Sequence, residues 1–268
     1  MPQMTVEVKK NPEPEATDPR FMTSLARGLE VLGAFDGHGA LNTAQISRLC
    51  GLSRSAVARC LFTLERLGYV GAQGGAYSLT PAVLPLARAF ALGDPLAKSA
   101  QVVVDALRDR LGESSSLAMF DPRHAYQNVV YVCRAEAARI ISVPLLTGSA
   151  LPSYCTSNGR VLLATLPPDA LGAYLAHAPF PARTTKTLTS ASALDAEIAQ
   201  VRAQGWASTD SELEPGLRSI AVPIPGARQP AALNLATQSA HRSPAWLMDI
   251  ALPELQAAAA HLARTVFQ

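Results

Sequence analysis

The sequence predicts an α+β protein, in which a small helical region closed by a β-hairpin precedes a larger domain of helices and strands. Helical spacing of apolar residues around Gly51 and two β-prone runs around Gly74-Gly75 indicate the first part. From Ser114 the pattern changes to short β-prone runs, which indicate the second part. With 268 residues, of which 49% are apolar, the chain can form more than one core. The expected parts are a flexible tail over 1–19, a helical region with a hairpin over 20–80, a linker helix over 81–95 and a second domain over 96–268.

Residues 43–63 have the pattern of two helices joined by a sharp turn. Gly51 suits the turn because glycine tolerates a positive φ, and Ser53 suits the N-cap of the second helix. A further helix is expected before them, over residues 24–35, with Arg27 facing outward. The apolar residues expected to face inward on these helices are Leu25, Leu29, Leu32, Ile46, Cys50, Leu52, Val57, Cys60, Leu61, Leu64 and Leu67.

A β-hairpin is expected directly after these helices. Gly68 ends the last helix, and two short β-prone runs, 69–70 and 77–79, flank Gln73-Gly74-Gly75. Three helices followed by a hairpin form a winged helix-turn-helix, a fold whose second motif helix enters the major groove of double-stranded DNA. A plain helical hairpin with solvated arginines is the alternative, and the predicted wing argues against it. The candidate DNA-contacting residues are Arg27, Ser53, Arg54, Ser55, Arg59 and Gln73.

The charge distribution favours the same function. Residues 20–90 carry seven arginines and three acidic residues, a net charge of +4, whereas residues 91–268 carry fourteen basic and fourteen acidic groups. Contact with a polyanion needs positive charge on the contacting surface. The net +2 of the whole chain hides this asymmetry.

Several other classes of protein are disfavoured. No stretch approaches 18 uninterrupted apolar residues, and the N-terminal residues lack the charged-then-apolar pattern of a signal peptide, so we expect no membrane partner. The cysteines show no C-x-x-C spacing and no companion histidine cluster, so we expect neither a metal nor another cofactor. Free cysteines suit a reducing cytoplasm. The four are Cys50, Cys60, Cys133 and Cys155.

The second domain is expected to be an α/β domain built on a largely antiparallel sheet. Its expected strands are 116–120, 129–134, 139–143, 217–224 and 231–237. Its expected helices are 96–111, 159–166, 169–177, 193–204 and 245–267, and an Ala/Leu-rich helix over 81–90 connects it to the hairpin.

The stretch 151–164 is the candidate ligand site of this domain. A small-residue loop runs into an apolar helix that Thr156 or Ser157 can cap, which leaves backbone N–H groups and the positive end of the helix dipole for a carboxylate or phosphate. An ordinary N-cap with nothing bound is the alternative. Strand alternation over 217–224 puts Leu217 and Ser219 on the face opposite Ile220 and leaves room for a ligand. Asn234, in a central strand, needs a hydrogen-bond partner.

Three further residues extend this hypothesis. Tyr154 either stacks on an aromatic ligand or packs in the core. Arg134 or Arg139 can pair with a carboxylate, and alternation does not decide between them. An anionic head on an apolar body fits such a site, and a small aromatic carboxylate has both.

Several segments resemble the IclR family of transcriptional regulators over roughly residues 20–265. They are SLARGLEVLGAF, the helix-turn-helix with its wing, GLRSIAVPI, and ARIISVPLLTGSALPSYCTSNGRVLLA. The last is similar to the subgroup that controls β-ketoadipate-pathway genes in response to protocatechuate or p-hydroxybenzoate, from which Pro144 and Asn158 depart. The resemblance implies a GAF-like effector domain and a homodimer or dimer of dimers. It implies the pocket positions Ile140, Ser157, Asn158, Leu217, Ser219 and Asn234.

Two other functions compete with a ligand-responsive regulator that reads an inverted repeat. An enzyme could use Cys155 or Ser157 with His177 or His241, but the chain has no G-x-S-x-G, no paired acids at catalytic spacing and no phosphate loop, so we expect no enzyme. An architectural DNA-binding protein would leave the second domain without a role. Saturable binding of a small acid would separate the regulator from the architectural protein.

Overall fold

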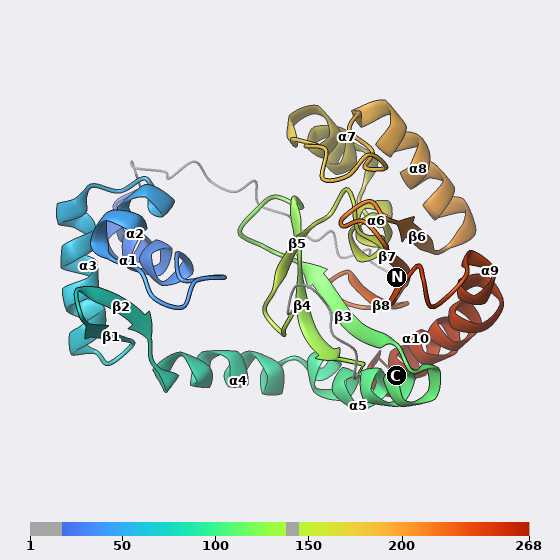
Figure 1. The fold of residues 1–268 in the computed structure, drawn as a ribbon, viewed down its shortest axis with the longest axis horizontal. Helices are drawn as coiled ribbons and strands as arrows, with labels where there is room; N and C mark the ends of the chain where they lie inside the picture. The colour runs from blue at the N-terminus through green and yellow to red at the C-terminus, as the bar shows by residue number, and fades with distance from the viewer. Residues whose placement is uncertain (1–17, 138–144, 268) are drawn as a thin grey trace. The chain divides into compact units, whose positions relative to one another are not determined.

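The computed structural model describes residues 18–137 and 145–267 (Figure 1). The chain forms two compact units, which meet in sequence between Phe90 and Ala91. That boundary falls within helix α4, Leu84–Gly93, which follows the short 3-10 turn Pro81–Val83. In the part of the chain that the structure describes, no helix is long and apolar enough to span a membrane.

The first unit contains the predicted winged helix-turn-helix. Gly51 ends the second helix with φ +66°, and the side chain of Ser53 accepts a hydrogen bond from the amide of Ala56, so both local predictions are confirmed. The wing turns at Gly74-Gly75, where φ is +58° and +81°, as a tight hairpin requires. The elements are α1 (Thr23–Gly33), α2 (Thr43–Cys50), α3 (Arg54–Arg66), β1 (Val70–Gln73) and β2 (Ala76–Leu79).

The predicted inward orientation of the apolar residues in this unit is wrong for three of them, which are exposed. Leu25 and Leu29 are 57% and 59% exposed, because α1 contributes its C-terminal half to the core, through Val31. Leu67 is 64% exposed, because α3 ends at Arg66 and the chain then turns at its C-cap. The core of the unit consists of Val31, Phe35, Leu41, Ile46, Val57, Leu61, Leu64 and Val70.

The second unit is built on one antiparallel sheet of six described strands in the order β5-β4-β3-β8-β7-β6. The sequence predicts four of these strands but misses β5 and β6, which have three and four residues and are too short for alternation to show. The predicted strand 139–143 lies outside the described residues. The strands are β3 (Ser114–Phe120), β4 (Asn128–Ala135), β5 (Ala150–Pro152), β6 (Ala207–Asp210), β7 (Leu217–Pro223) and β8 (Ala231–Gln238).

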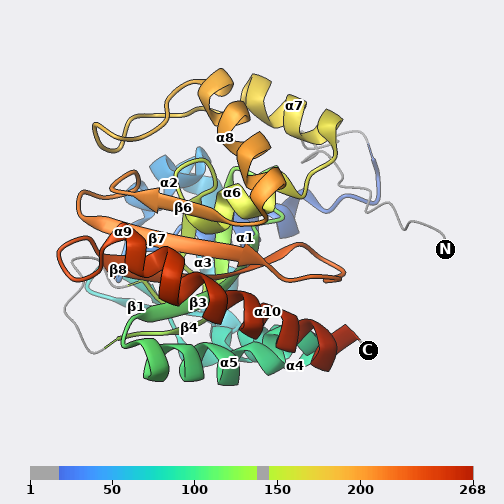
Figure 2. The same ribbon diagram turned by 90° about the vertical axis from the view of Figure 1, so that its right-hand side faces the viewer.

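Helices cover both faces of this sheet (Figure 2). On one face α5 and α10 pack on a core that includes Ile220, Val222 and Leu233, which confirms the predicted alternation of β7. On the other face α6 packs on the sheet and α8 packs on α6. The helices are α5 (Pro95–Leu111), α6 (Ser157–Ala164), α7 (Pro168–His177), α8 (Ala191–Gln204), α9 (Pro244–Trp246) and α10 (Leu252–Phe267), with a π-helical turn, η2 (Leu247–Ala251), before α10.

Candidate functional site

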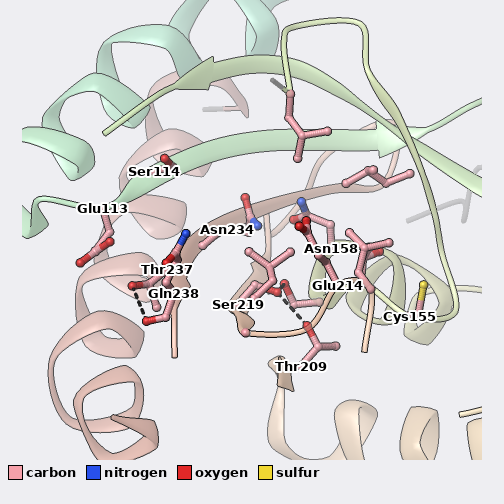
Figure 3. A pocket seen from close by; sticks show the side chains of 18 of the residues that line it. Glu113, Ser114, Cys155, Asn158, Thr209, Glu214, Ser219, Asn234, Thr237 and Gln238 are labelled. Atoms are coloured by element: carbon pink, nitrogen blue, oxygen red, sulfur yellow. Dashed lines mark hydrogen bonds between the residues drawn. The ribbon is translucent and has the colours of Figure 1, made fainter. Parts of the chain in front are cut away.

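A pocket of about 510 Å³ opens on the sheet face beside the N-terminus of α6 (Figure 3). A volume of this size is typical of sites for small organic ligands. Glu113 and Ser114 lie toward one end of the pocket in Figure 3, and Cys155 and Asn158 lie toward the other.

The register of the sheet explains why a pocket forms on this face. Ser114, Ala236, Ser219 and Thr209 are consecutive partners across β3, β8, β7 and β6. A parallel row runs through Arg134, Ser116, Asn234 and Ala221. Most of these side chains are small, so the two rows leave space between the sheet and the elements above it. The opposite face carries the large residues of the α5–α10 core.

The N-terminus of α6 lies directly on these rows. Thr156 caps the helix by accepting a hydrogen bond from the amide of Gly159. Gly159 is required here, because a Cβ at this position would lie 2.1 Å from the carbonyl oxygen of Ser153. The Ser157 hydroxyl lies 2.8 Å from the hydroxyl of Ser219, which lies 2.8 Å from that of Thr209. The close approach brings the helix N-terminus into the pocket, where its dipole favours an anion.

Arg134 supplies a buried positive charge to the pocket wall. Its side chain is 4% exposed, and its Nη2 lies 3.8 Å from a carboxylate oxygen of Glu136. Its Nε and Nη1 are buried and have no hydrogen-bond partner among the described residues. The guanidinium also lies 5.3 Å from the ring centre of Tyr131, whose phenol pKa is raised by burial. Unpaired N–H groups on a buried guanidinium are costly and suit a bidentate anionic partner.

Two buried asparagines add neutral hydrogen-bonding groups. Asn234 accepts a hydrogen bond of 2.5 Å from Ser116, so the partner that the sequence required is a neighbouring side chain. Asn158 is 1% exposed, and its Oδ1 has no partner within the described residues. The side chain of Asn158 lines the pocket, where that oxygen can accept from a ligand hydroxyl.

Six of the eight residues that the sequence proposes for effector contact line this one pocket. They are Arg134, Ser157, Asn158, Leu217, Ser219 and Asn234. Tyr154 does not line it. Its ring packs near Phe180 in a separate core, and its hydroxyl donates to the carbonyl of Pro181, because the loop before α6 turns the side chain away from the sheet. Ile140, and the alternative arginine Arg139, lie outside the described residues.

Sequence reasoning missed several of the lining residues. Glu113 and Ser114 follow α5, Tyr131 lies in β4, Thr209 lies in the short β6, and Glu214 lies in the loop before β7. Ser114 and Ser116 were an available signal, since two serines at alternate positions of a buried strand share one face and indicate that it packs on something other than an apolar core. No local signal marked Thr209 or Glu214.

The chemistry of the pocket favours binding of a ligand over its chemical conversion. The Ser157 hydroxyl pairs with Ser219, while the ring of His177 lies at the end of α7 beside the carbonyl of Ala173. Burial raises the pKa of the Cys155 thiol to about 11, so it is a neutral thiol at pH 7 and a poor nucleophile. Across residues 18–137 and 145–267, no group of three or more His, Cys, Asp or Glu side chains is placed to hold a metal ion.

The residues proposed for DNA contact all lie at the surface of the first unit. Arg54, Ser55 and Arg59 are exposed on the first two turns of α3, and Gln73 is exposed at the end of β1. Arg27 is exposed on α1. The Ser53 hydroxyl caps α3, so its oxygen already accepts one hydrogen bond. Arg54 and Arg59 therefore lie on the N-terminal half of α3, the second helix of the helix-turn-helix.

A winged helix-turn-helix joined to an α/β domain with its own small-molecule pocket defines a ligand-responsive transcriptional regulator. Comparisons with known proteins agree. Residues 24–74 match the IclR helix-turn-helix domain, and residues 91–264 match the bacterial transcriptional regulator IclR C-terminal family. The chain belongs to the IclR family of DNA-binding transcriptional regulators.

Individual relatives support the subgroup that the sequence resembles. The Pca regulon regulatory protein of Pseudomonas putida is 46% identical over 254 residues, which cover 93% of this chain and 86% of the relative. The crystal structure of an IclR family transcriptional regulator from Brucella abortus is 27% identical, with a TM-score of 0.77 and coverage of 94% and 95%. The inducer-binding domain of a PobR double mutant from Acinetobacter, crystallised with 3-hydroxybenzoic acid, is 27% identical with a TM-score of 0.57. The match covers 62% of this chain and 96% of that one.

Proposed function

We propose that this protein regulates genes for the catabolism of aromatic acids, and that a small aromatic carboxylate bound in the pocket beside α6 controls its binding to DNA. The regulator acts in the cytoplasm, where its operator lies. The carboxylate pairs with Arg134 and the N-terminus of α6, and the ring lies over the small residues of β7 and β8. Asn158 and the Ser157–Ser219–Thr209 hydroxyls face the ring substituents. The effector-contacting residues are Arg134, Ser157, Asn158, Leu217, Ser219 and Asn234.

The two buried nitrogens of Arg134 that lack hydrogen-bond partners among the described residues, Nε and Nη1, carry this proposal. The Arg134 side chain is 4% exposed, Glu136 lies 3.8 Å from Nη2 only, and Nε and Nη1 lack partners among the described residues, so an anion in the adjoining pocket would satisfy them. The walls beside it are apolar at Leu145, Leu151 and Leu217, which suits a ring. The PobR domain crystallised with 3-hydroxybenzoic acid supports the same ligand class for a relative.

Calorimetry with benzoate and with its neutral analogue benzamide tests the proposal. We expect the carboxylate to bind at least tenfold more tightly, a difference of about 1.4 kcal/mol, which one charge-assisted hydrogen bond can supply. A hydroxyl on the ring should tighten binding further, through the oxygen of Asn158. Equal affinities for the acid and the amide would mean that neither Arg134 nor the helix N-terminus holds the ligand.

A linear dicarboxylate is a second candidate, because a second arginine also lines the pocket. Arg183, in the loop after α7, is exposed and reaches the same cavity. Two guanidinium groups suit an acid with a carboxylate at each end. Titration with adipate beside benzoate separates the candidates. Tighter binding of adipate, lost in Arg183→Gln, would favour the dicarboxylate.

The DNA-binding form is proposed to be a homodimer, or a dimer of dimers, on an inverted-repeat operator. Within the first unit, Leu25 and Leu29 of α1 and Leu84, Leu86 and Phe90 of the linker region are each between 49% and 63% exposed. Apolar surface of this kind is costly in water and marks an interface.

We expect Leu29→Glu combined with Leu86→Glu to convert the dimer into a monomer, because the interface would then bury two charges. Sedimentation velocity at micromolar concentration measures the change. Val102→Glu on α5, where the side chain is 73% exposed, is the control and should sediment as the wild type does. A wild-type monomer that still binds DNA with full affinity would exclude the homodimer.

A further inference from the structure

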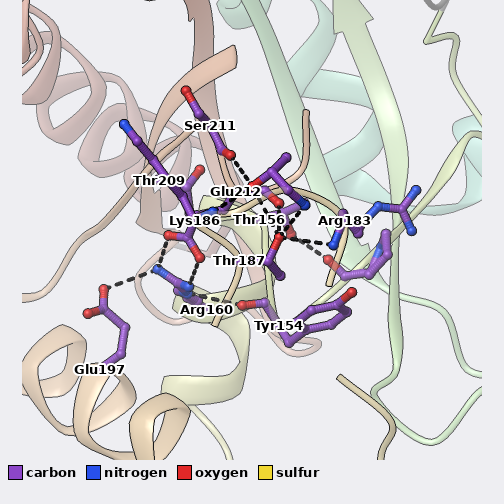
Figure 4. Close-up of polar contacts among 12 residues, drawn as sticks. Tyr154, Thr156, Arg160, Arg183, Lys186, Thr187, Glu197, Thr209, Ser211 and Glu212 are labelled. Carbon is purple, nitrogen blue, oxygen red and sulfur yellow. Dashed lines mark hydrogen bonds and ion pairs between the residues drawn. The ribbon is translucent and has the colours of Figure 1, made fainter. Parts of the chain in front are cut away.

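Arg160, on α6, lies at the centre of a buried ion-pair network beside the pocket (Figure 4). Its side chain is 2% exposed. Nη1 donates to Glu212 over 2.8 Å and Nη2 donates to the other oxygen of the same carboxylate, so the pair is bidentate. Nη1 also lies 3.4 Å from Glu197 of α8. Arg160 does not line the pocket itself.

The network joins the two loops that form one end of the pocket. Nε of Arg160 donates over 3.1 Å to the carbonyl of Tyr154, in the loop that leads into Cys155, Thr156 and Ser157. Glu212 lies in the loop over 211–216, between β6 and β7, which supplies Leu213 and Glu214 to the pocket wall. One guanidinium therefore fixes the loop before α6 and the loop before β7 at the same time.

Further contacts hold the second loop from its outer side. The Thr187 hydroxyl donates to the backbone carbonyl of Glu212 over 2.6 Å, and the Thr184 hydroxyl donates to that of Ser211 over 2.6 Å. The acceptors of both hydrogen bonds are backbone carbonyls, so neither bond involves the Glu212 side chain. Replacing the Glu212 side chain therefore removes the tie to Arg160 and leaves the outer contacts available.

The position of this network argues for more than stability. A buried ion pair contributes little net stability compared with an apolar pair of the same volume, but its directional bonds fix one geometry. Here that geometry is the spacing between Ser157 and Asn158 on one side and Leu213 and Glu214 on the other. All four residues line the pocket.

We propose that Arg160, through its bidentate pair with Glu212, is a positioning residue that sets effector affinity by fixing both loops at this end of the pocket without touching the effector. The inference rests on the proposed function of the pocket. It predicts that weakening the pair loosens the 211–216 loop and the helix N-terminus together, and that ligand affinity falls as a result.

Two conservative variants and one matched control test the inference. Glu212→Gln keeps the shape of the side chain and removes its charge, while Arg160→Lys keeps the charge and removes the planar fork. The control is Arg202→Lys. Arg202 contacts the C-terminal end of α6, where it donates hydrogen bonds to the carbonyls of Ala164 over 2.9 Å and Leu166 over 2.6 Å. It does not line the pocket.

Two measurements are made on the full-length protein, well below the melting temperature of each variant. Calorimetry with 3-hydroxybenzoate as the probe should give a Kd about tenfold weaker for Glu212→Gln and Arg160→Lys, and unchanged for Arg202→Lys. Hydrogen exchange, which needs no ligand, should show faster exchange at 153–159 and 211–216 in the two network variants alone. A Glu197→Gln variant should have a smaller effect on both, because that contact is long and more exposed.

The outcomes separate this inference from the proposed function. If all three of Glu212→Gln, Arg160→Lys and Arg202→Lys lower the melting temperature but none changes the exchange of the two loops, the network is structural only and the inference is wrong. If the loops loosen but Kd stays at the wild-type value, positioning does not set affinity and the inference is also wrong. If wild type binds no carboxylate probe, the proposed function fails, while the exchange experiment still decides whether the network fixes the loops.

Discussion

Replacing Arg134 with glutamine is expected to weaken binding of benzoate by at least about 30-fold, because a buried charge pair costs about 2 kcal/mol or more when one partner is removed. Glutamine keeps much of the side-chain length and an uncharged NH2 donor group, so the loss reports the charge and the fork geometry. Calorimetry with the acid and with benzamide, on wild type and variant, measures the effect. The acid should lose affinity and the amide should retain it.

The matched control for this variant is Arg110→Gln. Arg110 pairs with Glu254 in an exposed contact between α5 and α10 and does not line the pocket. The Arg110→Gln variant should bind benzoate and benzamide with the same affinities as the wild type. A variant at Arg134 that weakens acid and amide equally would show that Arg134 acts through pocket shape, and the carboxylate would then have to be assigned to another group.

The sequence predicts the face on which a side chain lies most reliably for elements that have one continuously buried face. Alternation along β7 places Ile220 in the α5–α10 core and Ser219 in the pocket because the strand is central and covered on both sides. The sequence limits the cap of α6 to Thr156 or Ser157, since a cap is a local interaction between neighbours in sequence, and the structure shows that Thr156 is the cap.

Contacts between side chains that lie far apart in the sequence could not be predicted from the sequence. Arg160 appears in the sequence as one charge in a short apolar helix, and its partner Glu212 is 52 positions away, in a loop without periodicity. Arg134 and Arg139 could not be separated, because the sequence does not give the register of β4 against β3; the structure places Arg134 opposite Ser116 on the pocket face. Leu25 and Leu29 follow helical spacing as a buried pair would, but the core of their unit is already filled by other side chains. Periodicity reports an apolar face and does not say what covers it.

The double variant Arg54→Ala, Arg59→Ala is expected to lower affinity for a duplex selected from a random pool with the wild-type protein by at least about 30-fold. Each arginine that contacts a base edge contributes about 1–3 kcal/mol of discrimination, and the two side chains lie on the exposed first two turns of α3. Fluorescence anisotropy at physiological salt measures the change. Repeating the selection with Arg59→Ala should relax the preference at one position in each half-site.

Arg66→Ala is the matched control, because Arg66 is exposed on the last turn of the same helix, where its guanidinium lies 5.3 Å from the ring centre of Phe62. Its loss removes one positive charge from the same helix, as Arg54→Ala or Arg59→Ala does singly, so it measures the nonspecific cost of one charge while base contacts remain. The salt dependence separates the two roles further. A phosphate contact changes the slope of log K against log salt by about one, whereas a base contact changes the preferred sequence. If Arg54→Ala and Arg59→Ala leave both affinity and selected sequence as in wild type, α3 is not the recognition helix, and the DNA-contacting surface must be sought elsewhere on the first unit.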